Sequence, residues 1–265
     1  MVNATSTTVE IPSVRIVTAE DIYKFCKLTG DTNKAHEGDR AAVPAFYIDW
    51  VVKNTFDVSQ SPDYVFSRLD ANFREVIRRD EPFCVVPKVT KTSDGVIQHE
   101  FQVIKGEVLV ADGTIEYRVQ REQPRRTHYD RQNLAVESRH GYTMDQIVTG
   151  GVKQTLNLGS DSAAKLAAAI SRTSNALLNT PKPEDQIPEQ SKIPFYGAHK
   201  LQVYPGVEEA LAQQNFSIQV RPGDKRRGVD VVYVRGMSLR GKEEAVVEKP
   251  FFDLTAIIFY LEPTA

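Results

Sequence analysis

The segment from Ala45 to Phe56 constrains the fold more than any other, because its apolar residues surround most of a helix. Pro44 opens this segment, and its apolar residues are Phe46, Ile48, Trp50, Val51, Val52 and Phe56. A helix with this pattern is buried. Strand-like runs follow between Val65 and Gln120, with turn residues at Ser93-Asp94-Gly95 and at Ala111-Asp112-Gly113. One buried helix followed by several strands predicts an α+β fold with an antiparallel sheet.

The same order of elements is predicted a second time. Residues 121–133 are charged and contain proline without apolar periodicity, which is typical of a linker. Residues 161–178 then have the pattern of a helix, and strand-like runs follow at 199–204, 215–223, 229–237 and 254–262. We therefore divide the chain into a first half, 1–124, and a second half, 125–265. The repeat is one of element order, without a residue-by-residue match.

Composition narrows the classes of partner. The 265 residues carry a net charge of −2, which gives no overall attraction to nucleic acid or to an anionic membrane. The amino-terminal residues lack a basic stretch followed by an apolar run, and no segment is apolar over the length of a membrane span, so we expect a cytoplasmic protein. Cys26 and Cys84 are too few for a disulfide framework and lack the spacing of metal ligands. Neither a metal nor a cofactor is predicted.

A compact polar motif follows the first predicted helix. Thr18 and Asp21 have the spacing of a capping box, and Gly30 supplies a stop, so this helix ends directly before Asp31. Asn33 and His36 follow Asp31 within a short loop. Taken alone, Asp31-Thr32-Asn33 is also a common turn sequence.

The wider pattern of Phe25, Thr29-Gly30-Asp31, Asn33 and His36 resembles the signature of the MaoC-like, R-specific enoyl-thioester hydratases and dehydratases. The resemblance implies a hot-dog fold, in which an antiparallel sheet wraps a long central helix. Larger members of the family hold two hot-dog halves in one chain, and only one half keeps the catalytic pair. We therefore expect a double hot-dog with its site in the first half and no evident catalytic pair in the second.

The implied reaction is the reversible hydration of an enoyl thioester carried by coenzyme A or by an acyl carrier protein. Asp31 and His36 would form the acid–base pair, and Asn33 would support their loop. The backbone N–H groups at the start of the next helix would polarise the thioester carbonyl, because orphan donors and the positive dipole end coincide there. The candidate substrate-binding residues are Pro44, Ala45, Phe46 and Tyr47.

Two other functions stay open on the same fold. Lys34 stands where the family usually has proline, and Ala45 where it often has glycine, which motivates a non-catalytic protein that binds acyl thioesters. The third candidate is a thioesterase. His128, His140 and His199 are interpreted as loop or strand-edge residues with surface or structural roles. A homodimer is compatible with each function.

Overall fold

The computed structural model describes two α-helices, one short 3₁₀ turn and nine strands. The residues that it describes are 13–29, 31, 33–56, 63–119, 193–207, 216–226, 229–240 and 247–261. The predicted linker at 121–133 and the predicted helix at 161–178 lie outside them. The helices are α1 (Ala19–Thr29) and α2 (Ala45–Thr55), and the 3₁₀ turn spans Lys34–His36. Neither of these described helices is long and apolar enough to cross a membrane.

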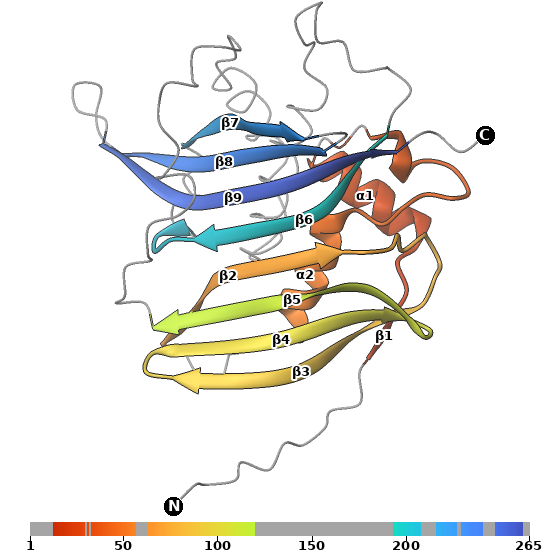
Figure 1. Ribbon diagram of the computed structural model, residues 1–265, viewed down its shortest axis with the longest axis horizontal. Helices are drawn as coiled ribbons and strands as arrows, with labels where there is room; N and C mark the ends of the chain where they lie inside the picture. The colour runs from red at the N-terminus through yellow and green to blue at the C-terminus, as the bar shows by residue number, and fades with distance from the viewer. Residues whose placement is uncertain are drawn as a thin grey trace, which may run out of the picture.

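The strands are β1 (Val14–Arg15), β2 (Tyr64–Phe73), β3 (Phe83–Ser93), β4 (Val96–Lys105), β5 (Val108–Val119), β6 (Ile193–Val203), β7 (Phe216–Arg226), β8 (Val229–Arg240) and β9 (Val247–Leu261). They form one antiparallel sheet in the order β1-β3-β4-β5-β2-β6-β9-β8-β7 (Figure 1). From the central pair outward, β2, β5, β4 and β3 on one side match β6, β9, β8 and β7 on the other. The strands predicted for the second half are therefore confirmed, whereas the helix predicted before them lies outside the described residues.

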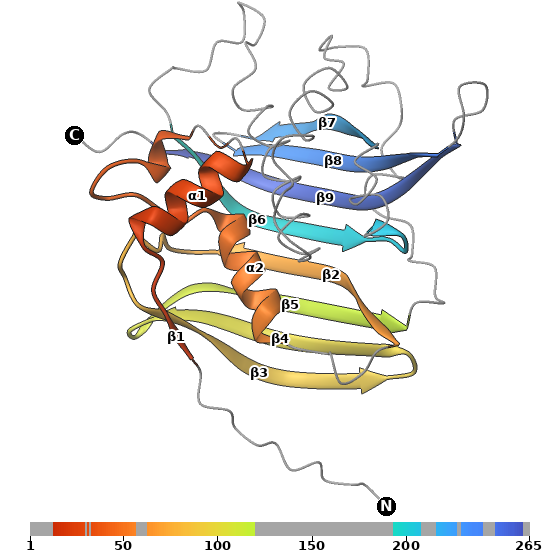
Figure 2. The same cartoon turned by 180° about the vertical axis from the view of Figure 1, so that it is seen from behind.

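Helix α2 packs on one face of this sheet (Figure 2), and its burial confirms the prediction from its apolar pattern. Its side chains share one core with residues from both sides of the sheet, including Leu69 and Ala71 of β2 and Leu201 and Val203 of β6. Because β2 and β6 pair directly, with Leu69 opposite Leu201, the core is continuous across the junction of the two halves. A helix from the first half can therefore contact a strand from the second.

The predicted capping box at the start of α1 is confirmed. The Thr18 backbone N–H and hydroxyl donate to Asp21 Oδ2, at 3.0 and 2.7 Å, and the Asp21 N–H donates to Thr18 Oγ1 at 3.2 Å. These contacts satisfy donors that a helix start otherwise leaves free. Gly30, the predicted stop, lies outside the described residues.

One of the two predicted turns is wrong. Ser93-Asp94-Gly95 does form the turn between β3 and β4, with Gly95 at a φ of 73°. Ala111-Asp112-Gly113 instead lies within β5, where Gly113 pairs with Ala71 and Phe101. A Cβ at Gly113 would lie 2.0 Å from the Asp70 carbonyl oxygen. This glycine therefore serves the close approach of two strands, and a turn is not formed.

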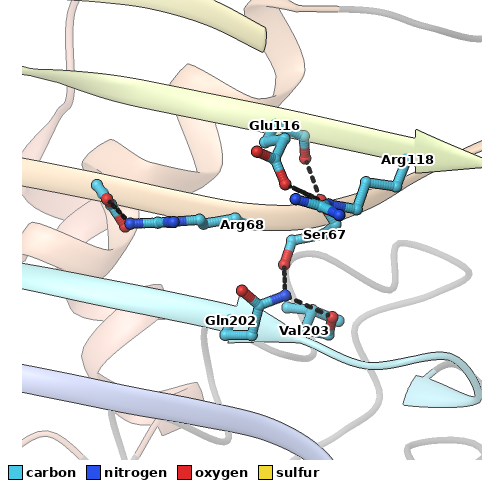
Figure 3. Close-up of polar contacts among 7 residues, drawn as sticks. Ser67, Arg68, Glu116, Arg118, Gln202 and Val203 are labelled. Carbon is cyan, nitrogen blue, oxygen red and sulfur yellow. Dashed lines mark hydrogen bonds and ion pairs between the residues drawn. The ribbon is translucent and has the colours of Figure 1, made fainter. Parts of the chain in front are cut away.

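A polar network ties the central strands together on the sheet face opposite α2 (Figure 3). Ser67 Oγ donates to Glu116 Oε1 at 3.0 Å, and Arg118 Nε donates to the same oxygen at 2.6 Å. Gln202 Nε2 of β6 donates to the Ser67 carbonyl oxygen at 2.9 Å. The buried Glu116 carboxylate is thus paired, and β6 is bonded to β2 by a side chain as well as by backbone.

Candidate active site

The loop after α1 is fixed by its own short polar contacts. The Asp31 backbone N–H donates to the Cys26 carbonyl oxygen at 2.9 Å, which closes the end of α1. Asp31 Oδ1 accepts from the Asn33 N–H at 2.9 Å, and Asn33 Oδ1 accepts from the Ala35 N–H at 3.0 Å. Asn33 is therefore the N-cap of the Lys34–His36 turn. The sequence folds locally so that Asp31 and His36 meet.

The Asp31 and His36 side chains face each other with 3.4 Å between Oδ2 and Nε2. Asp31 is 6% and His36 12% exposed, so both are nearly buried. His36 Nδ1 lies 2.7 Å from the Ala42 carbonyl oxygen, which can only accept, so we assign the hydrogen of the neutral ring to Nδ1. The lone pair on Nε2 then points toward a carboxylate oxygen. Two acceptors in this arrangement can share a proton or a water molecule.

The segment that carries the Ala42 carbonyl oxygen is held in place by backbone hydrogen bonds within the same chain. The Ala42 N–H donates to the Ala35 carbonyl oxygen at 2.7 Å, and the Val43 N–H donates to that of Ile77 at 2.8 Å. The Arg79 N–H donates to the Ala41 carbonyl oxygen, also at 2.8 Å. The imidazole is therefore oriented by a rigid backbone rather than by a mobile side chain.

Helix α2 begins beside this pair. Pro44 occupies the N-cap position, and its side chain makes no capping hydrogen bond. Its carbonyl oxygen accepts from the Tyr47 and Ile48 N–H groups at 3.0 and 3.3 Å. The Ala45 and Phe46 N–H groups precede these first bonds of the helix. Donors at this position carry the positive end of the helix dipole and suit a carbonyl oxygen that gains negative charge.

A small cavity of about 60 Å³ joins these elements. Six of the predicted site residues line it: Asp31, Asn33, His36, Pro44, Ala45 and Phe46. Phe195 and Tyr196 of β6 also line it, so both halves of the chain contribute. Tyr47 does not line the cavity, because its ring packs edge-on against Phe25 and Trp50 at 5.5 and 5.3 Å between centroids. Burial raises the pKa of Tyr47.

The structure contains a second carboxylate–imidazole pair that sequence reasoning missed. Asp49 Oδ2 of α2 lies 2.8 Å from His199 Nε2 of β6, with the side chains 10% and 0% exposed. The interpretation of His199 as a loop or strand-edge residue is wrong, since β6 lies at the centre of the sheet. The one signal in the sequence was a carboxylate, Asp49, flanked by the apolar residues Ile48 and Trp50 in a helix predicted to be buried.

Comparison with known proteins establishes the fold. No protein-family model and no curated protein matches this sequence. An acyl-CoA thioesterase II, TesB2, from Mycobacterium marinum matches with a TM-score of 0.54 at 10% identity, over 85% of this chain and 92% of that one. A protein described as an oleoyl thioesterase from Lactobacillus plantarum matches with a TM-score of 0.54 at 10% identity, over 96% and 98%.

An (R)-hydratase from A. caviae matches with a TM-score of 0.37 at 11% identity, over 44% of this chain and 99% of that one, a likeness too weak to carry an argument. At these identities the first two likenesses show the fold alone. Together with the antiparallel sheet on which α2 packs, these two likenesses establish an α+β hot-dog fold, as the resemblance of the motif implied. The MaoC-like family itself is not established by them.

Proposed function

We propose that this chain is an enzyme that adds water to acyl thioesters, with Asp31 and His36 as its acid–base pair. One observation carries the proposal: two acceptor atoms, Nε2 and Oδ2, face each other over 3.4 Å at the wall of the cavity. A water molecule that donates to both becomes a better nucleophile. The start of α2 lines the same cavity and offers N–H groups to the thioester oxygen.

The motif around Asp31 and His36 supports hydration of an enoyl thioester as the reaction. The water oxygen bonds to the β-carbon, one proton of the water passes to the pair, and the double-bond electrons move toward the carbonyl. The Ala45 and Phe46 N–H groups stabilise the enolate, and the pair then returns a proton to the α-carbon. Every step uses groups that line the cavity.

Hydrolysis of the thioester is the second candidate, and the names of the two fold neighbours that span most of the chain support it. The same water would attack the carbonyl carbon, the carbon–sulfur bond would break, and the thiol would leave with a proton. The two reactions require the same pair and the same N–H donors, but they give different products.

One assay separates the two reactions. The purified protein is incubated with crotonyl-CoA and with saturated butyryl-CoA, while the enoyl-thioester absorbance and the release of free thiol are followed. Hydration removes the enoyl absorbance without releasing thiol, whereas hydrolysis releases thiol from both substrates. The same acyl groups on acyl carrier protein distinguish the carrier. Saturable binding without conversion would instead support the non-catalytic alternative.

Two variants assign the reaction to the pair. Asp31→Asn and His36→Ala are expected to lose most turnover, because general acid–base catalysis contributes about 10²- to 10⁴-fold. Asp39→Asn is the matched control: its carboxylate lies in the same loop but is almost fully exposed and pairs with Arg79. Parent-like rates in His36→Ala, or conversion of no thioester by the parent, would contradict the proposal.

The proposal extends to the organisation of the chain. We propose that 1–124 and 125–265 are the two hot-dog halves of a cytoplasmic enzyme and that the reaction takes place in the first half. A homodimer of such chains is the corresponding proposal for assembly, and light scattering of the eluted protein tests it.

A further inference from the structure

Phe46 connects the candidate site to the second half of the chain. Its backbone N–H is a candidate donor to the substrate, and its ring contacts two side chains of β6. The Tyr196 ring meets it edge-on, with 5.0 Å between centroids, and the His199 ring stacks on it at 5.3 Å and 23°. The position of Phe46 therefore depends on residues far away in the sequence.

A bulge in β6 makes this double contact possible. The pairing of β6 with β9 shifts by one residue at Gly197, so that Tyr196 lies opposite Ile258 and His199 opposite Ala256. Both side chains therefore face the core. A Cβ at position 197 would lie 1.8 Å from the Phe259 ring, which explains a glycine in the bulge.

Asp49 holds the same histidine from the next turn of α2. It follows Phe46 by three positions, which places both side chains on one side of the helix. Its Oδ2 lies 2.8 Å from His199 Nε2, a close approach without the geometry of a hydrogen bond, and neither Asp49 Oδ2 nor either ring nitrogen of His199 has a hydrogen-bond partner among the residues that the structure describes. The buried polar contact of His199 with α2 is therefore concentrated on Asp49.

We infer that Asp49 and His199 are positioning residues that fix the distance of the α2 amino end, with its Ala45 and Phe46 N–H groups, from β6. This inference rests on the proposed function. The 2.8 Å contact is about 1 Å shorter than the 3.5–4.0 Å separation of two packed carbon atoms. An apolar pair would fill the same space but hold the helix farther out, and a shift of about 1 Å can cost about 100-fold in rate.

The double variant Asp49→Leu/His199→Phe tests the inference. Replacing both members of a buried polar pair by apolar residues of similar volume is often neutral or stabilising, and phenylalanine keeps a ring against Phe46. We expect a folded protein with kcat at least about tenfold lower and KM changed by less than about threefold. A stable double variant with the parent kcat would overturn the inference, because the pair would then contribute to stability alone and not to turnover.

The conservative variant Asp49→Asn keeps a short polar contact and is expected to retain kcat within about threefold of the parent. Asp49→Glu keeps the carboxylate and lengthens the side chain by one methylene. If the double variant does not fold, Asp49→Glu takes its place as the test, and we expect a lower kcat than in the parent. The matched control is Arg235→Met/Asp253→Leu, which removes a buried pair with a 2.6 Å contact between β8 and β9. Neither control residue lines the cavity, and we expect parent turnover from any folded control.

A readout without substrate separates the inference from the proposed function. The Tyr47 and Ile48 amides donate to the Pro44 carbonyl oxygen, so their hydrogen exchange reports on the amino end of α2. We expect faster exchange in the double variant than in the parent or the control. Unchanged exchange would overturn the inference even if the parent converted no thioester, whereas parent turnover alone decides the proposed function.

Discussion

Two carboxylate–imidazole pairs, both found among the residues that the structure describes, neighbour Phe46, but they differ in the properties that decide what such a pair can do. Asp31 and His36 come from one loop, line a cavity, and keep 3.4 Å between their nearest polar atoms. Asp49 and His199 come from a helix of the first half and a strand of the second, have side chains 10% and 0% exposed, do not line that cavity, and lie 2.8 Å apart.

The position of each pair relative to the cavity indicates which of them can exchange protons with a substrate. A water molecule in the cavity can lie within hydrogen-bond distance of both acceptors, and a ligand can reach side chains that line the cavity. The second pair does not line that cavity, and its close contact holds two elements together. We therefore propose a chemical role for the first pair and a positioning role for the second.

The largest expected effect separates the pairs by activity. His36→Ala is expected to lower kcat by about 10²- to 10⁴-fold. The same change should lower the free energy of unfolding by less than about 2 kcal/mol, since it removes one buried hydrogen bond to the Ala42 carbonyl oxygen. Steady-state kinetics and urea unfolding measure both quantities. A variant that is mainly unstable and still fully active would break the comparison.

The opposite profile is expected of Asp49→Ala. Removing one partner of a buried polar pair leaves the other without its nearest polar atom and typically costs about 1–3 kcal/mol of unfolding free energy. Urea unfolding of Asp49→Ala beside Asp31→Asn measures the contrast. If Asp31→Asn were the more destabilised of the two, the division of roles between the pairs would be reversed.

The first pair could be predicted from the sequence because its geometry is local. Asp31, Asn33 and His36 lie within one loop, and their contacts follow from a helix end, an Asx-type contact and a short turn. The capping box followed from residue spacing, and the strands from their alternating pattern, for the same reason. Local rules act over a few residues and leave a visible signature.

The second pair could not be predicted, because no spacing rule links a residue of α2 to a strand of the other half. Only the pairing of β2 with β6 brings Asp49 and His199 together. Gly113 is a similar case: aspartate and glycine together are typical of a turn, and the close approach of the Asp70 carbonyl is visible only in three dimensions. Long-range packing overrides the local preference at both places.

A medium effect tests whether instability near the site is enough to reduce turnover. Thr18→Ala removes the capping box of α1, the helix that leads into Asp31, and should cost about 1 kcal/mol of unfolding free energy. Turnover should stay at the parent level, because Asp31 is held by the Cys26 carbonyl oxygen and by Asn33. A large loss of activity would show that the first pair also depends on helix stability, which would weaken the contrast with the second.

The smallest expected effect reports the charge of Asp31 through a neighbouring thiol. The pKa of the Cys26 thiol is raised to about 12, mainly by burial and in addition by the negative charges of Asp31 and Glu37. Asp31→Asn should therefore lower this pKa slightly, so that at any pH below about 12 the thiolate fraction and the alkylation rate rise. The rate is measured against pH in a Cys84→Ser background, with Asp49→Asn as the control that should leave it unchanged. Equal rates in parent and Asp31→Asn would mean that Asp31 is not ionised in the free protein, and the water-activating role would then have to pass to His36 alone.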